Sequence, residues 1–474
     1  MSYGLYIGKN LTADGHAWLA GYGDEPSSHW LEIIPKKKHK IGKKITVGVT
    51  KNADMPGRLI KIPQVSQTHK HIRVSYSYYL GVPVPITNGG LNEYGVAVRD
   101  IWSKSRKELI NMTPKNQKGP NYSDLARIVL ERAKSAREAI TIVSKLIKKY
   151  GESTYGGNSH IFADSKEAWV MIQFAGGKGL WAAERLGPNS IRASRPGYIE
   201  EIPIHEKNNP NFLYSRNLIR FCKNKGWYSR GPFNVNKILG DKKGRWKGVK
   251  WIERKIKKLA KKTKKIKLKD VMWAIRTTKL TGDTAGYGQI VPLVDLKNNN
   301  LRTLWHSPIG AVASPFSPIF IGQTMIPEEF MMHRYLTVGE SHRFLDERKK
   351  KEKDTLSLVT QDVESTVSAV YECKRLFYLI LHNKKRFFPM ATKAFEDREK
   401  RLNNKINKIL KSAKTLLKKN KKNVCKNILN NFSITELRNS LNLVQRLSKS
   451  MEVDIRKSKG FVKSVKPKSF NQIW

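Results

Sequence analysis

The chain opens with residues 1–25, MSYGLYIGKNLTADGHAWLAGYGDE, and this stretch predicts two short strands. Residues 4–9 (GLYIGK) and 16–22 (HAWLAGY) are rich in apolar and aromatic residues, and the turn sequence TADG, Thr12–Gly15, lies between them. A terminus that enters a sheet at once is immobile, whereas most termini fray. We therefore expect residue 2 to be held in a fixed position.

Residue 2 is a serine, which is small enough to permit removal of the initiator methionine. The mature chain would then carry a hydroxyl group and a free α-amine on the same residue. Because such an amine titrates near about pH 8, much of it is neutral in the cell and can accept the hydroxyl proton. Met-Ser starts are also common in chains where the serine has no chemical role, so Ser2 alone leaves both interpretations open.

Further elements follow in an order typical of an α+β protein. Residues 72–79, 95–101 and 168–174 predict strands, and residues 123–150 predict one amphipathic helix that Ser123 caps and Gly151 ends. This order favours a mixed or antiparallel sheet covered by helices over a strict βαβ alternation.

The residue pattern changes after Arg343. Residues 362–387 and 393–418 lack glycine, have apolar residues at helical spacing, and predict two long helices. We therefore expect a main domain over residues 1–335, with a Lys-rich insertion around 236–270, and a helical C-terminal region over 336–474.

The chain is strongly basic. Its 90 Lys and Arg residues against 39 Asp and Glu residues give a net charge of +51, which is typical of proteins that bind nucleic acid or other anions. The densest run, residues 241–270, is nearly all lysine on a helical apolar pattern, and no RNP-like pair, zinc-finger spacing or P-loop accompanies it. We expect a solvated basic face rather than a dedicated nucleic-acid partner.

Cysteines and apolar runs indicate the compartment. Cys222, Cys373 and Cys425 are far apart and odd in number, which favours a reducing compartment without disulfides. The sequence contains no CxxC or HExxH spacing, so no metal site is expected, and no organic cofactor is expected either. Neither a membrane-spanning run nor a secretory signal is seen, so the expected location is cytoplasmic.

Several motifs occur in the order found in one enzyme family. They are Ser2–Lys9 with Ala13-Asp14-Gly15 and Asp24, then GLNEYGVAV (90–98), SAREA (135–139), HIFAD (160–164) and SPFSPIFIG (314–322). Together they resemble the dipeptidase family of N-terminal-nucleophile (Ntn) hydrolases, which includes dipeptidase A and the secernins. That family is related to choloylglycine hydrolase and penicillin V acylase. The resemblance covers about three quarters of the chain and implies a four-layer αββα sandwich, here with a helical C-terminal extension.

The resemblance also implies roles for single residues. Ser2 takes the place of the family's nucleophilic cysteine, and Asp24 matches the aspartate that orients its amine. The family's arginine beside the nucleophile is Gly21 here, so Arg99, Arg192 and Arg195 are candidates to replace its charge.

The resemblance to the choloylglycine relatives further implies donors to an oxyanion near position 102 and at position 194. Trp102 carries an indole N–H and Ser194 a hydroxyl group. Asn92 is a further candidate for the catalytic set, although a role as turn residues is favoured over direct catalysis for both Asn92 and Asn88. We take the catalytic candidates to be Ser2, Asp24, Asn92, Trp102 and Ser194, and the substrate-binding candidates to be Arg99 and Arg195.

The resulting hypothesis is a peptidase that hydrolyses dipeptides, or another small amide, through an acyl-enzyme on Ser2. Two alternatives remain open: a catalytically inactive Ntn-fold binding protein, and another amidase of the choloylglycine hydrolase type. A nucleic-acid-binding protein, suggested by the net charge, is a third alternative. The oligomeric state is left open, with a homo-oligomer compatible with the sequence.

Overall fold

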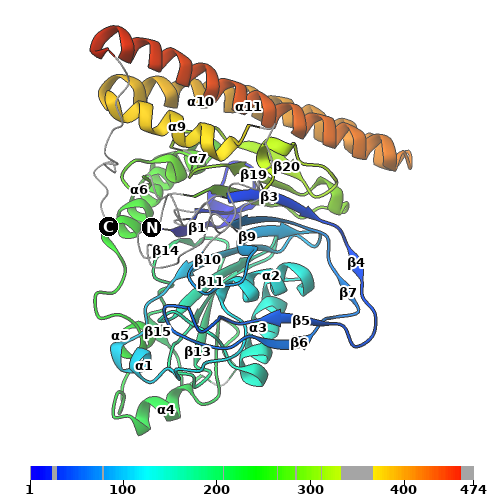
Figure 1. Ribbon diagram of the computed structural model, residues 1–474. Helices are drawn as coiled ribbons and strands as arrows, with labels where there is room; N and C mark the ends of the chain where they lie inside the picture. Colours follow the sequence, from blue (N-terminus) through cyan, green and yellow to red (C-terminus); the bar gives the residue numbers. More distant parts are fainter. Residues whose placement is uncertain are drawn as a thin grey trace.

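The computed structural model describes residues 2–23, 29–76, 79–206, 208–263, 265–282, 286–310, 312–332 and 367–460. Within them, two antiparallel sheets form the body of the protein (Figure 1). The six-stranded sheet contains, in spatial order, β14 (Ile191–Ser194), β1 (Tyr3–Ile7), β2 (Ala17–Tyr22), β18 (Gly288–Leu293), β19 (Thr303–Ser307) and β20 (Ser317–Phe320). The eight-stranded sheet contains β16 (Phe212–Tyr214), β13 (Trp181–Leu186), β12 (Ala168–Gln173), β11 (Asn158–Ala163), β10 (Ala97–Trp102), β9 (Ile86–Asn92), β8 (His71–Tyr76) and β3 (His29–Ile34).

The two sheets pack face to face, and their inner faces share one apolar core. Leu19 and Val291 of the six-stranded sheet belong to the same buried cluster as Val74, Ile101 and Ile161 of the eight-stranded sheet. Alternation along each strand sends the other residues to the outer faces, where helices must cover them. The arrangement therefore has two sheets in the middle and a helical layer on each side.

The outer face of the eight-stranded sheet is covered by α2 (Tyr122–Arg132) and α3 (Ala136–Tyr150). The predicted single helix over 123–150 is wrong, because the chain breaks at 133–135. There the Ser135 side chain accepts a hydrogen bond from Glu138 N and starts a second helix. The first helix is capped by Asn121 rather than Ser123, in a capping box with Asp124.

The outer face of the six-stranded sheet is covered by α6 (Lys247–Thr263), α7 (Leu268–Arg276) and α10 (Lys384–Lys418). The Lys-rich run thus forms a helix of the outer layer. Val249, Ile252 and Ile256 of α6 are buried, whereas the lysines of α6 are exposed. This agrees with the solvated basic face expected from the sequence. The four-layer αββα sandwich is confirmed.

The C-terminal region has three helices among the described residues, where the sequence predicted two. They are α9 (Ala369–His382), α10 and α11 (Lys422–Lys459), and α11 was missed. Residues 362–366 of the predicted first helix lie outside the described residues. Figure 1 shows α10 and α11 side by side along one flank of the sandwich, and Leu429 of α11 joins the same core as the six-stranded sheet.

Consecutive residues of α10 hold the backbone of Phe316, just before β20. Glu399 accepts a hydrogen bond from Phe316 N at 2.8 Å, and Arg398 donates to Phe316 O at 3.3 Å. This ties the C-terminal helices to the SPFSPIFIG segment. The predicted domain boundary near residue 335 falls among residues 333–366, which lie outside the described residues.

The remaining elements are short. They are the paired strands β4 (Lys37–Lys38) and β7 (Gln67–Thr68), β5 (Lys44–Val47) and β6 (Ile60–Pro63), β15 (Glu201–Ile202) and β17 (Phe233–Asn234), and the helices α1 (Lys107–Asn111), α4 (Leu218–Asn224) and α5 (Val235–Leu239).

Candidate active site

Ser2 immediately precedes β1, which lies in the six-stranded sheet between β14 and β2. Only 6% of the residue is exposed. By the alternation of the strand, residue 2 shares a face with Gly4, whose added Cβ would lie 2.8 Å from Ile101 Cδ1 of the eight-stranded sheet. The Ser2 side chain is thus on the inner face, as an immobile terminus in a sheet requires.

Arg195 directly contacts Ser2. Its Nη1 donates to Ser2 Oγ at 2.8 Å and to Ser2 O at 2.9 Å. Arg195 follows the end of β14, whose residue Ser194 pairs with Gly4, so the sheet register brings the guanidinium to Ser2, the residue just before β1. A hydrogen bond from a charged donor is among the stronger polar contacts in proteins and fixes the hydroxyl oxygen.

Two tryptophans hold the Arg195 guanidinium. Its Cζ lies 4.4 Å from the ring centroid of Trp246 and 5.7 Å from that of Trp102, and the two indoles meet edge to face. Trp246 N also donates to Arg195 O at 3.2 Å. Trp246 was missed in the sequence, because nothing in the Lys-rich run around it predicts proximity to β14. Cation–π contacts of this kind orient a guanidinium without neutralising it.

Arg99 on β10 lies across the inter-sheet space, fully buried. Its Nη2 donates to Tyr22 O at 2.9 Å, and its Nη1 donates to the Tyr287 hydroxyl group. A Cβ added to Gly21 would lie 3.1 Å from Arg99 Nε. Arg99 therefore fills the space into which a side chain at position 21 would project.

Ser194 and Trp102 carry donors that are buried. Ser194 Oγ and Trp102 Nε1 have no hydrogen-bond partner within the part of the chain that the structure describes. Buried polar atoms are normally paired, so these two groups are free to bond to a water molecule or to a bound ligand. Both residues lie near Arg195. Ser194 precedes Arg195 in the chain, and the Arg195 guanidinium lies over the Trp102 ring.

The two asparagines differ. Asn92 Nδ2 donates to Leu130 O and Ala133 O, and its Oδ1 accepts from Tyr94 N and Val96 N, so its amide is fully used in joining the β9–β10 turn to α2. The structure does not bring it to Ser2. Asn88 is fully buried, and neither atom of its amide has a partner among the described residues. The main-chain carbonyl oxygen of Asn88 accepts a hydrogen bond from Arg99 Nη1 at 3.4 Å, which places Asn88 beside the Arg99 guanidinium.

Asp24 lies outside the described residues, so its predicted contact with the Ser2 amine stays a prediction. Arg192 has a structural role, because it donates to Tyr198 O at 2.6 Å and pairs with Glu184 at 2.7 Å. Of the three arginine candidates, Arg195 reaches Ser2, Arg99 reaches the neighbourhood of Gly21, and Arg192 has its guanidinium committed to β13 and the chain beyond β14.

An aromatic group backs Arg99. The Tyr287 ring is tilted against His29 at 5.5 Å and stacked on His306 at 6.2 Å. Burial, reinforced by the nearby His29, lowers the pKa of His306 to about 3, so this imidazole is neutral at cellular pH. Tyr287 was missed because a lone tyrosine in a strand reads as a core residue.

In the described ranges, no group of three His, Cys, Asp or Glu side chains is arranged to hold a metal ion. The helices in the same ranges include none whose length and apolar character would let it traverse a bilayer. The three cysteines are unpaired and buried.

With this geometry in place, similarity to known proteins can be assigned. Residues 60–247, less than half of the chain, match the model of peptidase family C69. The probable dipeptidase B of Lactococcus lactis is 33% identical over 102 residues, 21% of each chain. The probable dipeptidase B of Streptococcus pyogenes is 27% identical over 244 residues, 49% of this chain and 45% of the relative.

A further relative is the probable dipeptidase A of S. pyogenes, which is 25% identical over 252 residues, half of each chain. These matches span half or less of the length of the curated relatives. Among solved structures, a mutant conjugated bile acid hydrolase from Clostridium perfringens aligns at 12% identity and a TM-score of 0.29, over 68% of this chain and 92% of that one. The resemblance to the dipeptidase family found in the sequence is confirmed.

Proposed function

We propose that this protein is a dipeptidase-type hydrolase in which Ser2 becomes the N-terminal nucleophile once Met1 is removed. The observation that carries the proposal is the contact of Arg195 Nη1 with both Ser2 Oγ and Ser2 O, at 2.8 and 2.9 Å, on a residue buried in a sheet. The sequence similarity to dipeptidases A and B supports peptides as the substrate class.

In the proposed reaction, Ser2 Oγ attacks the carbonyl carbon of the peptide bond while the Ser2 α-amine accepts the hydroxyl proton. The amine then passes this proton to the leaving nitrogen, and the C–N bond breaks to leave an ester on Ser2. Water, deprotonated by the same amine, attacks the ester and releases the acid. Each proton removed by the amine is returned, so the enzyme ends as it began.

The groups around Ser2 would stabilise the negative charge that develops during the reaction. A guanidinium beside Ser2 favours a neutral amine over an ammonium and favours negative charge developing on the hydroxyl oxygen. Ser194 Oγ and Trp102 Nε1, buried without partners among the described residues, are available to donate to the oxyanion or to the substrate. Arg99 would add positive potential from the opposite sheet.

The test is hydrolysis of a dipeptide panel by the wild-type protein and by the Ser2→Ala variant. Intact mass must show Met1 removal; a protein that retains Met1 is first treated with methionine aminopeptidase. We expect cleavage by the wild type and none above background by Ser2→Ala, with both proteins unfolding at the same temperature. A Ser2→Ala variant that retains wild-type turnover would refute the nucleophile.

A Ser2→Cys variant separates this proposal from a catalytically inactive binding protein with the same fold. A thiol is the better nucleophile and takes the position of the family's cysteine. If wild type and Ser2→Cys both lack dipeptidase and small-amide activity with residue 2 free, the site is inactive and the proposed function fails.

A further inference from the structure

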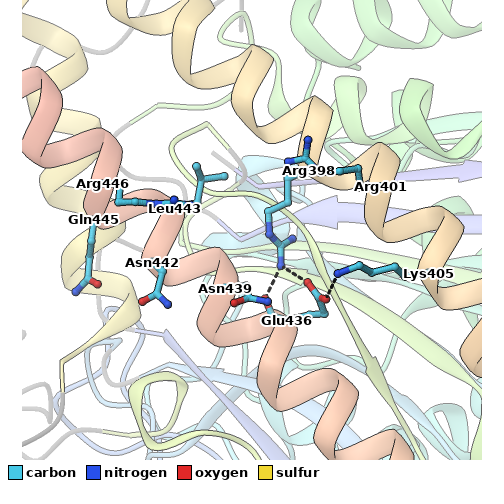
Figure 2. Close-up of a pocket in the computed structure, with 9 residues that line it drawn as sticks. All are labelled: Arg398, Arg401, Lys405, Glu436, Asn439, Asn442, Leu443, Gln445 and Arg446. Atoms are coloured by element: carbon cyan, nitrogen blue, oxygen red, sulfur yellow. Dashed lines mark hydrogen bonds and ion pairs between the residues drawn. The ribbon is translucent and has the colours of Figure 1, made fainter.

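A pocket of about 560 Å³ lies between α10 and α11, among the C-terminal helices (Figure 2). Its lining is polar and basic: Arg398, Arg401, Lys405, Glu436, Asn439, Asn442, Leu443, Gln445 and Arg446. Three of its four cations are arginines, although lysine is the commoner base in this chain. The planar guanidinium binds phosphate oxygens in pairs, whereas lysine is a point charge.

The floor of the pocket has its charges partly paired. Arg398 and Glu436 are both buried and lie 3.1 Å apart, and Lys405 lies 3.0 Å from the other carboxylate oxygen of Glu436. Figure 2 shows both cations directed at this one carboxylate. Two positive charges therefore share one negative charge.

The rim has positive charges without compensation. Across the described ranges, neither Arg401 of α10 nor Arg446 of α11 has an ion pair or a side-chain hydrogen bond, and both are exposed. The pocket therefore carries four cations and one carboxylate. The charge of Arg401 opposes the positive charge of Arg398, and it contributes to lowering the pKa of Arg398, for which burial is the larger cause. A bound anion would relieve this repulsion.

The neutral side chains of the lining fit the same ligand. Asn439, Asn442 and Gln445 offer amide donors in addition to the guanidinium groups. Spacing along each helix keeps these groups on one face: Arg398, Arg401 and Lys405 on α10, and Asn439, Asn442 and Arg446 on α11. The volume exceeds that of a single phosphate ion and leaves room for a larger phosphate-bearing molecule.

We propose that the α10–α11 pocket is a binding site for a small molecule that carries a diphosphate group. In this site Arg401 of α10 and Arg446 of α11 bind the ligand from opposite ends of the pocket, the asparagine amides add hydrogen bonds, and the Arg398–Glu436–Lys405 group forms the floor. The proposal does not depend on peptidase activity. Because Arg398 also bonds to Phe316 O, an occupied pocket is in contact with the segment before β20.

The test is calorimetric titration of the full chain with inorganic pyrophosphate at physiological salt. We expect saturable binding with one site per chain and a raised unfolding temperature. The variant with Arg401→Gln and Arg446→Gln should lose at least tenfold in affinity. A matched control, Lys414→Gln with Lys457→Gln, removes the same charge from exposed positions of the same helices outside the pocket and should bind as the wild type does.

A second pair of substitutions, Asn439→Asp with Asn442→Asp, places carboxylates at exposed positions of the rim, where folding is expected to persist. It should abolish pyrophosphate binding. Absence of saturable binding by the wild type would overturn the proposal. Equal loss in the pocket variant and the control would also overturn it, since that result means attraction to the overall charge. A single-stranded RNA oligomer could instead bind more tightly than pyrophosphate and lose affinity equally in the Arg401→Gln/Arg446→Gln variant and in the control. That result would assign the surface to nucleic acid.

Discussion

Buried arginines are used in two ways in this protein. Arg99, between the sheets, is held by neutral acceptors among the described residues: Tyr22 O, Asn88 O, Asp100 O and the Tyr287 hydroxyl group. Arg276, between α7 and α10, is paired with the carboxylate of Glu399, with both side chains about 95% buried or more.

The difference separates a charge whose field is cancelled by a partner from one whose field persists. A carboxylate cancels the field of a guanidinium, so the Arg276–Glu399 pair joins helices and leaves little potential behind. Carbonyl and hydroxyl dipoles stabilise a guanidinium without neutralising it, so Arg99 keeps a positive potential between the sheets. Buried charge without a counter-charge is costly, and such sites are frequently functional.

The largest effect is expected from breaking the structural pair. Glu399→Ala leaves Arg276 buried without its carboxylate and Phe316 N without its acceptor, and should lower the free energy of unfolding by about 3–5 kcal/mol. Chemical denaturation measures this. The control, Glu396→Ala on the exposed face of α10, should change stability by no more than about 0.5 kcal/mol.

The double variant Arg276→Met with Glu399→Leu sharpens this prediction. With both charges gone, no uncompensated ion remains, and much of the lost stability should return. A double variant as unstable as Glu399→Ala would mean that the orphaned Phe316 N, rather than the unpaired charge, dominates the loss.

The next effect is expected on catalysis. Under the proposed function, Arg99→Met removes positive potential next to Gly21 and should lower kcat/KM for a cleaved dipeptide by about 10²–10³-fold. Arg99→Lys keeps the charge and should recover part of that loss. If Arg99→Met lowers the unfolding temperature but leaves kcat/KM unchanged, Arg99 is a structural residue like Arg276.

Acid stability gives a third comparison within the same inter-sheet space. An unfolded histidine binds a proton near pH 6.5, whereas burial keeps the pKa of His306 at about 3 in the folded protein. The unfolded state therefore gains protons as pH falls below 6.5, and stability decreases with them. One such group contributes about 2 kcal/mol between pH 6.5 and roughly pH 5.

The variant His306→Phe should show a shallower loss of stability over this range, and the same stability dependence as the wild type above pH 7. Denaturation at a series of pH values measures the slope. The remaining slope should come from His71 and His160, since burial lowers the pKa of each to about 4. An unchanged slope in His306→Phe would show that His306 is protonated more readily than its burial indicates.

The sequence predicted local features better than packing. The strands around Leu5, Leu19 and Val170 could be predicted, because alternation and turn residues are local signals. The break between α2 and α3 was missed, because Ala133 and Ala136 continue the apolar spacing and only the bond to Asn92 and the Ser135 cap reveal it. Arg195 was one of three arginine candidates, and only the pairing of Ser194 with Gly4 distinguishes it.

The smallest effect tests how Arg195 is held. Trp246→Ala removes the closer of the two rings against the guanidinium, whose Cζ lies 4.4 Å from the Trp246 centroid, and should lower kcat about tenfold with little change in KM. Trp246→Phe keeps an aromatic face and should recover most of the rate. As a control, Trp273→Ala on α7, where the ring is 38% exposed, should leave kcat unchanged.

A purely structural role for Trp246 predicts a different pattern. Loss of packing would lower the unfolding temperature of Trp246→Ala without moving kcat, measured well below that temperature. A selective fall in kcat would instead mean that the orientation of an arginine over Ser2 limits the reaction. Arg195 would then be a cation whose orientation by its aromatic neighbours matters to the reaction, whereas the pairing of Arg276 with Glu399 serves stability.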